Sequence, residues 1–338
     1  MENHVGNDGD WFNKAANFIT LGKYDEALQC YDKVIESSPT NIDAWNNKGV
    51  VLINLKRNEE AIQCFDKVLE KETDNVSVWN NKGTALDNLG RSEEAIRCYD
   101  KAIELESNPN PIYYRNKGLV LQDQKRYEEA IRCFDEALRL EPDYADAWNS
   151  KGIVLAILKR NEEAIQCFDK ILQICPNDAD AWNNKGSVLT YLQKHGDAIE
   201  CFDKAIELEP YNANAWSNKC DALDELGKAD EAIKCYDKVI EINPSAADAW
   251  NNKGTVFSRL ANYGEAVKCF DKAIELNPRK ANAWYNKGLA LEYLGRYEKT
   301  IKCYDKAIEL EPNPIYYRKK GLVLQDQKRY EEAIRCFD

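Results

Sequence analysis

Cysteines and carboxylates are the side chains of this sequence that could carry chemistry. The chain of 338 residues has twelve cysteines but only two histidines, His4 and His195. No two cysteines stand in a C-x2-C arrangement, so the sequence lacks the ligand set of a zinc site. We therefore expect no metal and no cofactor. Ten of the cysteines recur every 33 to 35 residues: Cys30, Cys64, Cys98, Cys133, Cys167, Cys201, Cys235, Cys269, Cys303 and Cys336.

The regular spacing of these cysteines does not predict disulfides between repeats. Equivalent helices of neighbouring repeats pack about 8–10 Å apart, whereas a disulfide needs Cα atoms about 4.4–6.8 Å apart. This excludes a ladder of disulfides along the repeats, and we interpret the recurring cysteine as a small buried hydrophobic residue. Cys175 lies outside the pattern, beside Pro176, and is expected to be more exposed.

No catalytic motif is present. The sequence has no glycine-rich phosphate loop and no G-x-S-x-G. His195 occupies a position that holds an aromatic residue such as Tyr127 in other repeats. The recurring Asp32, Asp66 and Asp100 are expected on a solvated face. We predict that the chain is not an enzyme.

The charge balance limits the classes of partner. Aspartate and glutamate outnumber lysine and arginine by 58 to 46, which gives a net charge of -12. Such a field repels phosphate backbones and anionic lipid, so neither nucleic acid nor a membrane is an expected partner. The N-terminus is polar, and no later stretch has the roughly 18 consecutive apolar residues of a membrane span. We expect a cytoplasmic protein.

The aromatic residues reveal an internal repeat of 34 residues. All eight tryptophans follow one spacing, and Tyr114 and Tyr317 fill the positions where a tryptophan is missing. The ten repeat aromatics are Trp11, Trp45, Trp79, Tyr114, Trp148, Trp182, Trp216, Trp250, Trp284 and Tyr317. A cysteine follows each of them 19 residues later, and an alanine stands three residues before that cysteine, except at Thr300.

The apolar spacing within a repeat predicts two helices. In the second repeat, Trp45, Gly49 and Leu52 follow the 3.6-residue period, and Ala61 and Phe65 do so after a polar break. Most repeats end at a proline, which terminates the second helix. We expect the second helices to be capped at their N-termini by Asn58 and its equivalents Ser92 and Asn161.

These residues resemble the tetratricopeptide repeat family, whose pattern is W-x2-L-G-x2-Y, then A-x3-F, then P. In the sixth repeat the match is Trp182, Gly186, Leu189, Ala198 and Phe202. The resemblance implies an all-α fold, an α-solenoid in which stacked helix-turn-helix units form a right-handed superhelix. We expect a disordered tail over 1–7 and a single solenoid over 8–338, with a truncated last unit. The units start near residues 8, 42, 76, 111, 145, 179, 213, 247, 281 and 314.

One position of the family pattern differs in every repeat of this chain. Where the family has leucine, all ten repeats have lysine, and we expect the lysine stem to cover apolar surface while the ammonium group reaches water. The next residue is usually glycine and is expected to face the alanine of the second helix at the closest crossing of the two helices. On this interpretation, the repeats with Cys220 and Thr300 have looser crossings.

A stretch of 24 residues occurs twice. Residues 112–135 and 315–338 differ only at Asn116 and Lys319. A stack of repeats tolerates copied units, so we interpret the pair as a copying event. The second copy leaves the last unit incomplete, and we expect a frayed or self-associating C-terminal end.

A row of asparagines is the main candidate for a binding site. Two residues after the aromatic, eight of the ten repeats have asparagine: Asn13, Asn47, Asn81, Asn116, Asn184, Asn218, Asn252 and Asn286. In the resembled fold the first helices line the inner, concave wall. An amide both donates and accepts hydrogen bonds, so the row could hold the backbone of an extended peptide. The row resembles that of the O-linked N-acetylglucosamine transferases, although no transferase domain is present. The alternative is that these asparagines serve helix packing and solubility.

Other positions of the first helices are candidates for specificity. Apolar side chains are expected on the inner wall in repeats two, four and five, and acidic side chains in repeat seven. These candidates are Val50, Ile53, Leu119, Ile153, Ala156, Ile157, Asp221, Asp224 and Glu225. A partner with an apolar anchor followed by a basic stretch would complement them.

Three functions fit this reading. The favoured one is a non-catalytic scaffold or adaptor that binds an extended peptide or a partner protein in the concave groove. The second is a self-assembling scaffold, in which the uncapped C-terminal end stacks head to tail on another copy. The third is a regulatory arm of a larger enzyme. RNA recognition of the pentatricopeptide kind is disfavoured by the net charge of -12 and the period of 34.

Overall fold

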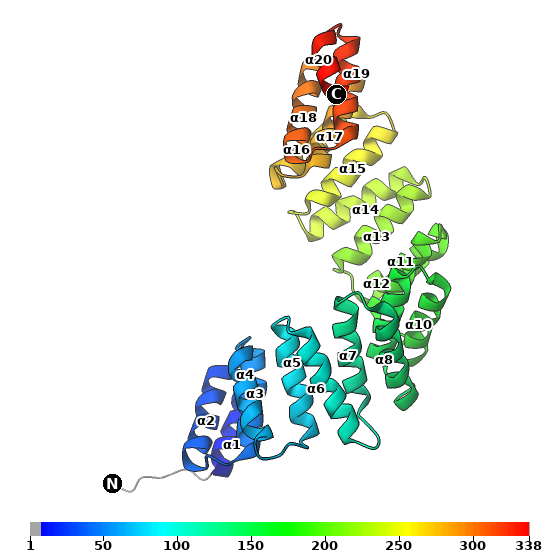
Figure 1. The fold of residues 1–338 in the computed structure, drawn as a ribbon. Helices are drawn as coiled ribbons and strands as arrows, with labels where there is room; N and C mark the ends of the chain where they lie inside the picture. Colours follow the sequence, from blue (N-terminus) through cyan, green and yellow to red (C-terminus); the bar gives the residue numbers. More distant parts are fainter. Residues whose placement is uncertain (1–7, 338) are drawn as a thin grey trace. The chain divides into compact units, whose positions relative to one another are not determined.

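The computed structural model describes residues 8–337 as a succession of paired α-helices (Figure 1). The expected tail over 1–7 lies outside the described residues. By their internal contacts the helices divide into two compact units, with the boundary in the sequence between Ile174 and Cys175. The first unit contains α1 (Asp8–Thr20), α2 (Tyr24–Ser37), α3 (Ile42–Asn54), α4 (Asn58–Leu69), α5 (Val76–Asn88), α6 (Ser92–Leu105), α7 (Pro111–Asp123), α8 (Tyr127–Leu140), α9 (Ala145–Ile157) and α10 (Asn161–Ile174).

The second unit continues the same pattern. It contains α11 (Ala179–Tyr191), α12 (His195–Leu208), α13 (Ala213–Glu225), α14 (Ala229–Ile242), α15 (Ala247–Arg259), α16 (Tyr263–Leu276), α17 (Ala281–Tyr293), α18 (Tyr297–Leu310), α19 (Pro314–Asp326) and α20 (Tyr330–Phe337). Odd-numbered helices are the first helices of the ten repeats, and even-numbered helices are the second. The all-α fold of stacked helix-turn-helix units is confirmed, and the single solenoid over 8–338 stays a prediction.

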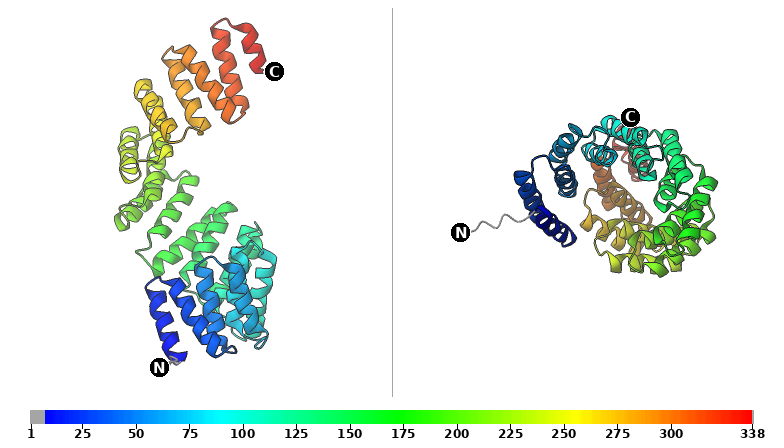
Figure 2. Two further views of the ribbon diagram at one scale, coloured as in Figure 1. Left: turned by 90° about the vertical axis from the view of Figure 1, so that its left-hand side faces the viewer. Right: turned by 90° about the horizontal axis from the view of Figure 1, so that it is seen from below.

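Each helix pair is closed by a turn with one residue in the left-handed region. Lys56 has a φ of 59°, and the same repeat position has a positive φ throughout: Gly22, Lys56, Gly90, Lys125, Lys159, Gln193, Gly227, Ala261, Gly295 and Lys328. After this residue the chain bonds back to the first helix, because the Arg57 amide donates to the Leu52 carbonyl at 2.9 Å. This bond and the positive φ form the usual C-terminal cap of a helix. Figure 2 shows the resulting pairs from two further directions.

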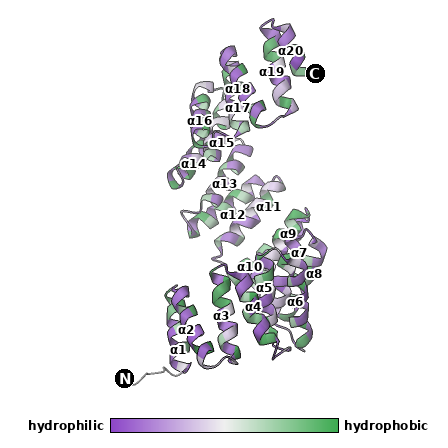
Figure 3. Ribbon diagram, turned by 60° about the vertical axis from the view of Figure 1, so that its left-hand side comes forward, coloured by the Kyte–Doolittle hydropathy of each residue, from purple (hydrophilic) through white to green (hydrophobic). Residues whose placement is uncertain are grey.

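The two helices of a repeat cross at the glycine of the first helix. A Cβ atom built on Gly49 would lie 2.5 Å from Cε1 of Phe65, so only glycine fits without displacing that ring. The atoms nearest to this Cβ belong to the aromatic residue 16 positions after the glycine, so the closest contact is with that ring and not with the alanine that we expected. Phe65 is fully buried. Polar and apolar residues both occur along the helices in Figure 3, as packing on one face requires.

The expected N-caps of the second helices are also corrected. Asn58, Ser92 and Asn161 are the first residues of their helices, and the capping position before Asn58 belongs to Arg57. Arg57 forms two hydrogen bonds of 2.7 Å with the carboxylate of Glu60 in the first turn. The side chain of Asn58 turns inward instead and accepts a hydrogen bond from Asn88 at 3.4 Å. Polar residues at a helix start are therefore no sure sign of a cap when the neighbouring repeat offers a partner.

The recurrent lysine joins each repeat to the one before it. The ammonium group of Lys48 lies 2.6 Å from the carboxylate of Asp32 and 5.5 Å from the ring centre of Trp45. Its side chain is 22% exposed, and the ammonium group that we expected to reach water is paired with this half-exposed carboxylate. The side chains of Asp32, Asp66 and Asp100 are 42–47% exposed, as expected of a solvated face, and in addition they are the partners of these lysines. Equivalent ion pairs are Lys82–Asp66, Lys117–Asp100, Lys151–Asp135, Lys219–Asp203, Lys253–Asp237, Lys287–Asp271 and Lys320–Asp305.

Most of the repeated cysteines are buried hydrophobic residues, as expected. Eight of the ten repeat cysteines are buried free thiols, namely Cys30, Cys64, Cys98, Cys133, Cys167, Cys201, Cys269 and Cys303. Burial raises the pKa of Cys64 to about 11, so the thiol stays protonated at neutral pH. Cys175 is exposed, as predicted.

Repeat seven departs from this pattern. Cys220 takes the place of the crossing glycine and forms a disulfide with Cys235, with the two Cα atoms 5.4 Å apart. Both residues are buried, at 0% and 5% exposure. The interpretation of Cys235 as a free hydrophobic thiol is therefore wrong, and the crossing expected to be loose is covalently closed. Two cysteines on the paired helices of one repeat can thus reach the distance that a disulfide needs, which cysteines at equivalent positions of neighbouring repeats cannot.

Candidate binding groove

The first helices form the inner wall within each unit. In the first unit α3 contacts α5, α5 contacts α7 and α7 contacts α9, and in the second unit α11, α13, α15 and α17 contact one another in the same successive way. Contacts of this extent do not occur between second helices among residues 8–337. Neighbouring first helices are thus closer to one another than neighbouring second helices are. Each unit therefore curves toward its first helices. We call their exposed side the groove face; it is formed by the residues two, five, eight and nine positions after the repeat aromatic.

The asparagine row lies on the groove face and bridges neighbouring repeats. Asn81 donates from Nδ2 to Oδ1 of Asn46 at 3.1 Å, so the amide of one repeat is held by the repeat before it. The same bond recurs elsewhere: Asn116 to Asn80 at 3.1 Å, Asn218 to Asn183 at 2.9 Å, and Asn286 to Asn251 at 3.1 Å. Most members of the row are half-buried, and Asn13 is exposed. The bridging bonds support a packing role, and they also fix the orientation of the amides.

The predicted apolar candidates of the first unit are on this face but differ in exposure. Val50 is 37% and Ile157 49% exposed, whereas Ile53, Leu119 and Ile153 are half-buried between neighbouring helices. They come from three different first helices, α3, α7 and α9. They form separate apolar patches along the wall.

The acidic candidates of repeat seven, in contrast, share one pocket. Asp221, Asp224 and Glu225 of α13 line a cavity of about 560 Å³ together with Asn252 and Arg259 of α15. Further walls come from Tyr236 and Thr255. We call this cavity the acidic pocket. It brings four of the predicted site residues together.

Hydrogen bonds and one ion pair organise the acidic pocket. Oδ1 of Asp221 accepts from the hydroxyl of Tyr236 at 2.5 Å and from Nδ2 of Asn252 at 3.3 Å. Asp221 is exposed as a residue, but partial burial of its carboxylate against the pocket wall raises its pKa, while the two hydrogen bonds act in the opposite direction. The guanidinium of Arg259 pairs with Asp224. Burial, with the nearby charge of Asp221, also raises the pKa of Tyr236, which keeps its proton.

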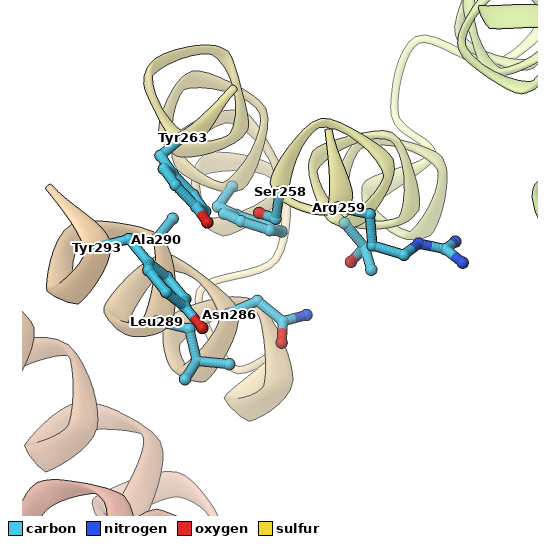
Figure 4. A pocket seen from close by; sticks show the side chains of 9 residues that line it. Ser258, Arg259, Tyr263, Asn286, Leu289, Ala290 and Tyr293 are labelled. Carbon is cyan, nitrogen blue, oxygen red and sulfur yellow. The ribbon is translucent and has the colours of Figure 1, made fainter. Parts of the chain in front are cut away.

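A second pocket adjoins the acidic pocket on the other side of α15. It has a volume of about 320 Å³ and is lined by Leu289, Tyr293 and Asn286 of α17 and by Tyr263 of α16, among others. The rings of Tyr263 and Tyr293 are stacked, with centres 4.6 Å apart and planes 4° from parallel. Figure 4 shows the two parallel rings beside Leu289, with the Arg259 side chain pointing away from them. We call this cavity the tyrosine pocket.

Sequence reasoning missed the tyrosine pocket although its signal was available. Leu289 and Tyr293 stand five and nine residues after Trp284, at the same repeat positions as Asp221 and Glu225 after Trp216. These positions vary from repeat to repeat while the core positions do not. Comparing them across all ten repeats would have found the pocket.

The described residues gather no metal ligands. No group of three His, Cys, Asp or Glu side chains between residues 8 and 337 is arranged to hold a metal ion. Likewise, none of the helices in this range is both long enough and apolar enough to cross a membrane.

Three family models described as tetratricopeptide repeat match the chain. One model matches residues 76–109, 179–212, 213–246, 247–280 and 281–314, which together make up half of the chain. The other two match residues 18–83 and residues 115–179. None of the curated proteins compared with the chain matches it.

Several solved structures are similar. The crystal structure of YrrB, described as a TPR protein with an unusual peptide-binding site, is 29% identical with a TM-score of 0.47; the match covers 56% of this chain and 97% of YrrB. MamA from Desulfovibrio magneticus RS-1 is 25% identical with a TM-score of 0.48, over 50% of this chain and 96% of that one. Yeast Tom70 is 16% identical with a TM-score of 0.51, over 98% of this chain and 90% of Tom70, a likeness of fold.

Proposed function

Because the chain belongs to the tetratricopeptide repeat family, we propose that it is a non-catalytic scaffold that binds an extended segment of a partner protein along its groove face. The observation that carries this proposal is the asparagine row. Its members share one repeat position, and several have their side chains held by the preceding repeat.

The hydrogen bonds between repeats leave capacity for a ligand. An asparagine amide has two N–H donors and an acceptor oxygen with two lone pairs. Asn218 uses one hydrogen toward Oδ1 of Asn183 and the other, at 3.3 Å, toward Ser187, whereas Asn286 has one bridging bond to Asn251. A fixed amide loses little entropy when it binds, which favours association with a peptide backbone.

The spacing of the row suits an extended chain. Packed helices lie about 8–10 Å apart, and an extended chain advances about 3.3 Å per residue. Successive asparagines could therefore meet about every third peptide unit. Because only main-chain groups are contacted, the row would bind segments of different sequence.

Binding of random short peptides displayed on phage tests the proposal on the full chain. We expect the wild-type chain to retain peptides, and the triple variant Asn81→Ala, Asn218→Ala, Asn286→Ala to bind the retained peptides at least about tenfold more weakly, which is about 1.4 kcal/mol. A matched control replaces Gln29, Gln63 and Gln166 by alanine. These are exposed amides on second helices and should leave binding unchanged. Unchanged binding in the asparagine variant would assign the row to packing alone.

A second candidate function rests on the exposed apolar residues of α19 and α20. Ile315, Ile334 and Phe337 are 57%, 58% and 51% exposed. A second copy of the chain that covers them would give head-to-tail assembly. Light scattering over a range of concentrations distinguishes this from a monomeric scaffold, and Ile334→Lys should abolish any growth in mass.

A further inference from the structure

We propose that the groove face of repeats seven to nine selects a peptide segment in which a lysine or arginine stands two or three residues from an aromatic or large aliphatic side chain. The inference rests on the proposed function, because it assigns the chemistry of the segment that the groove would bind. The acidic pocket would hold the basic side chain, and the tyrosine pocket the apolar one.

The acidic pocket has an excess of negative charge that the described residues leave uncompensated. It contains three carboxylates, from Asp221, Asp224 and Glu225, and one cation, Arg259, which pairs with Asp224. Asp221 accepts hydrogen bonds only from neutral donors, Tyr236 and Asn252. Glu225 is exposed and makes no ion pair within residues 8–337. A ligand cation entering here would meet two carboxylates that lack a cationic partner.

The walls of the acidic pocket strengthen such a contact. Asp221 is exposed as a residue, but its Oδ1 is held against the pocket wall by Tyr236 and Asn252, and the partial burial of the carboxylate raises its pKa. A charge pair in such surroundings is stronger than one in bulk water. A lysine or arginine also offers several N–H donors, which the carboxylates of Asp221 and Glu225 could accept.

The tyrosine pocket offers an apolar surface of the right size for one side chain. Tyr293 is 69% exposed, although its ring is stacked on Tyr263. An aromatic ring on the free side of this stack, or an aliphatic side chain against Leu289, would bury that surface. Aromatic residues that are exposed in a groove and held by a neighbour are typical anchors of protein interfaces.

The two pockets are close enough for one short segment. Thr255 and Arg259 of α15 line both of them, so the pockets lie on opposite sides of a single helix. Their separation is therefore about one helix spacing, 8–10 Å. At about 3.3 Å per residue, an extended chain covers this distance in two or three residues.

Sequencing the peptides retained from the random library tests the inference. We expect enrichment of sequences with a basic residue two or three positions from an aromatic or large aliphatic residue. Retained peptides without this pair would overturn the inference and leave the proposed function standing. If the full chain retains no peptide at all, both fall.

Charge variants then test the acidic pocket with an enriched peptide. The double variant Asp221→Asn, Glu225→Gln should bind about tenfold more weakly at low salt, and the loss should shrink at about 1 M salt because screening acts over about 3 Å there. Replacing the basic residue of the peptide by glutamine should cost nothing further in this variant. The control Glu207→Gln, Glu241→Gln makes the same charge change on α12 and α14 and should leave affinity unchanged. Equal losses of peptide affinity in both double variants would mean that only the net charge of the protein matters. This result would overturn the assignment of the basic side chain to the acidic pocket.

Removing the exposed ring tests the tyrosine pocket. Tyr293→Ala should weaken binding about tenfold at low and high salt alike, because the lost contact is apolar. Tyr211, at 84% exposure in the turn before α13, is the matched control, and Tyr211→Ala should have no effect. Unchanged binding in Tyr293→Ala would remove the apolar half of the proposed motif.

Discussion

The two copies of the duplicated segment have the same sequence but different environments. The core positions of their first helices, α7 and α19, are buried alike, since Val120 and Val323 are 0% and 1% exposed. Their second helices differ. Phe134 of α8 is fully buried, and its equivalent in α20, Phe337, is 51% exposed; Ile131 and Ile334 are 6% and 58% exposed.

This difference shows which neighbour completes each helix. α7 and α19 each pack on the repeat before them, α6 and α18. α8 packs in addition on α9, whereas no helix follows α20 among the described residues. The first helix of a repeat is thus covered from one side of the stack and the second helix from the other, as expected when repeats share a continuous core.

Truncating the equivalent phenylalanines should separate the two copies most clearly. Phe134→Ala should cost about 3–5 kcal/mol of the free energy of unfolding, because it leaves a cavity in a closed core. Phe337→Ala should cost about 1 kcal/mol or less, because its ring is already half in water. Urea unfolding followed by circular dichroism, with hydrogen exchange to localise the loss, measures both. Equal losses would contradict the role of the following helix.

Adding a methyl group at the helix crossing should give the next largest difference. A Cβ at Gly118 would lie 2.5 Å from the ring of Phe134, which has no room to move, so Gly118→Ala should cost about 1–3 kcal/mol. A Cβ at Gly321 would lie 2.6 Å from Phe337, whose exposed ring can turn away. Gly321→Ala should therefore be nearly neutral, helped by the better helix propensity of alanine. Thermal unfolding of the two variants would show the difference.

A backbone change in the turns should affect both copies alike. Lys125 and Lys328 have φ values of 61° and 62°. Residues other than glycine adopt this left-handed backbone conformation at a cost of about 1–2 kcal/mol. Lys125→Gly and Lys328→Gly should each stabilise the chain by about 1 kcal/mol or slightly less. The same urea titration applies. A gain in the free energy of unfolding at only one of the two positions would mean that contacts with the neighbouring repeat affect the stability of the turn.

The ion pair to the preceding repeat should give the smallest effect, again equal in both copies. Lys117 meets Asp100 and Lys320 meets Asp305, each at 2.5 Å, with the aspartates 42% and 51% exposed. Asp100→Asn and Asp305→Asn should each cost less than about 1 kcal/mol, because exposed ion pairs contribute little. Unfolding at low and high salt checks this, since the cost should vanish at high salt.

Much of the fold could be predicted because the repeat shows the same residues ten times. Trp45, Gly49 and Cys64 recur at fixed spacing, and such regularity follows from identical packing in every unit. The contacts of individual side chains between repeats were less accessible. The ammonium group of Lys48 was expected only to reach water, because its partner Asp32 belongs to the second helix of the previous repeat.

The binding site was predictable only where its residues departed from the repeat in an obvious way. The acidic residues of α13 are conspicuous because the same repeat positions hold residues of other kinds elsewhere. Tyr293 is not conspicuous in a sequence with 18 tyrosines. Its role depends on stacking with Tyr263, which is 30 residues away and belongs to another repeat. The disulfide of repeat seven needed a comparison within one repeat, between the crossing residue and the cysteine of the second helix.

The Cys220–Cys235 bond also bears on how the array would respond to mechanical force. If the chain is pulled at its ends, tension passes through the bridge and bypasses the 15-residue span between the two sulfur-bearing residues. A span of this length could extend by roughly 45 Å at about 3.4 Å per residue. Repeat seven would therefore lengthen less than its neighbours when it unravels, unless a reductant opens the bridge.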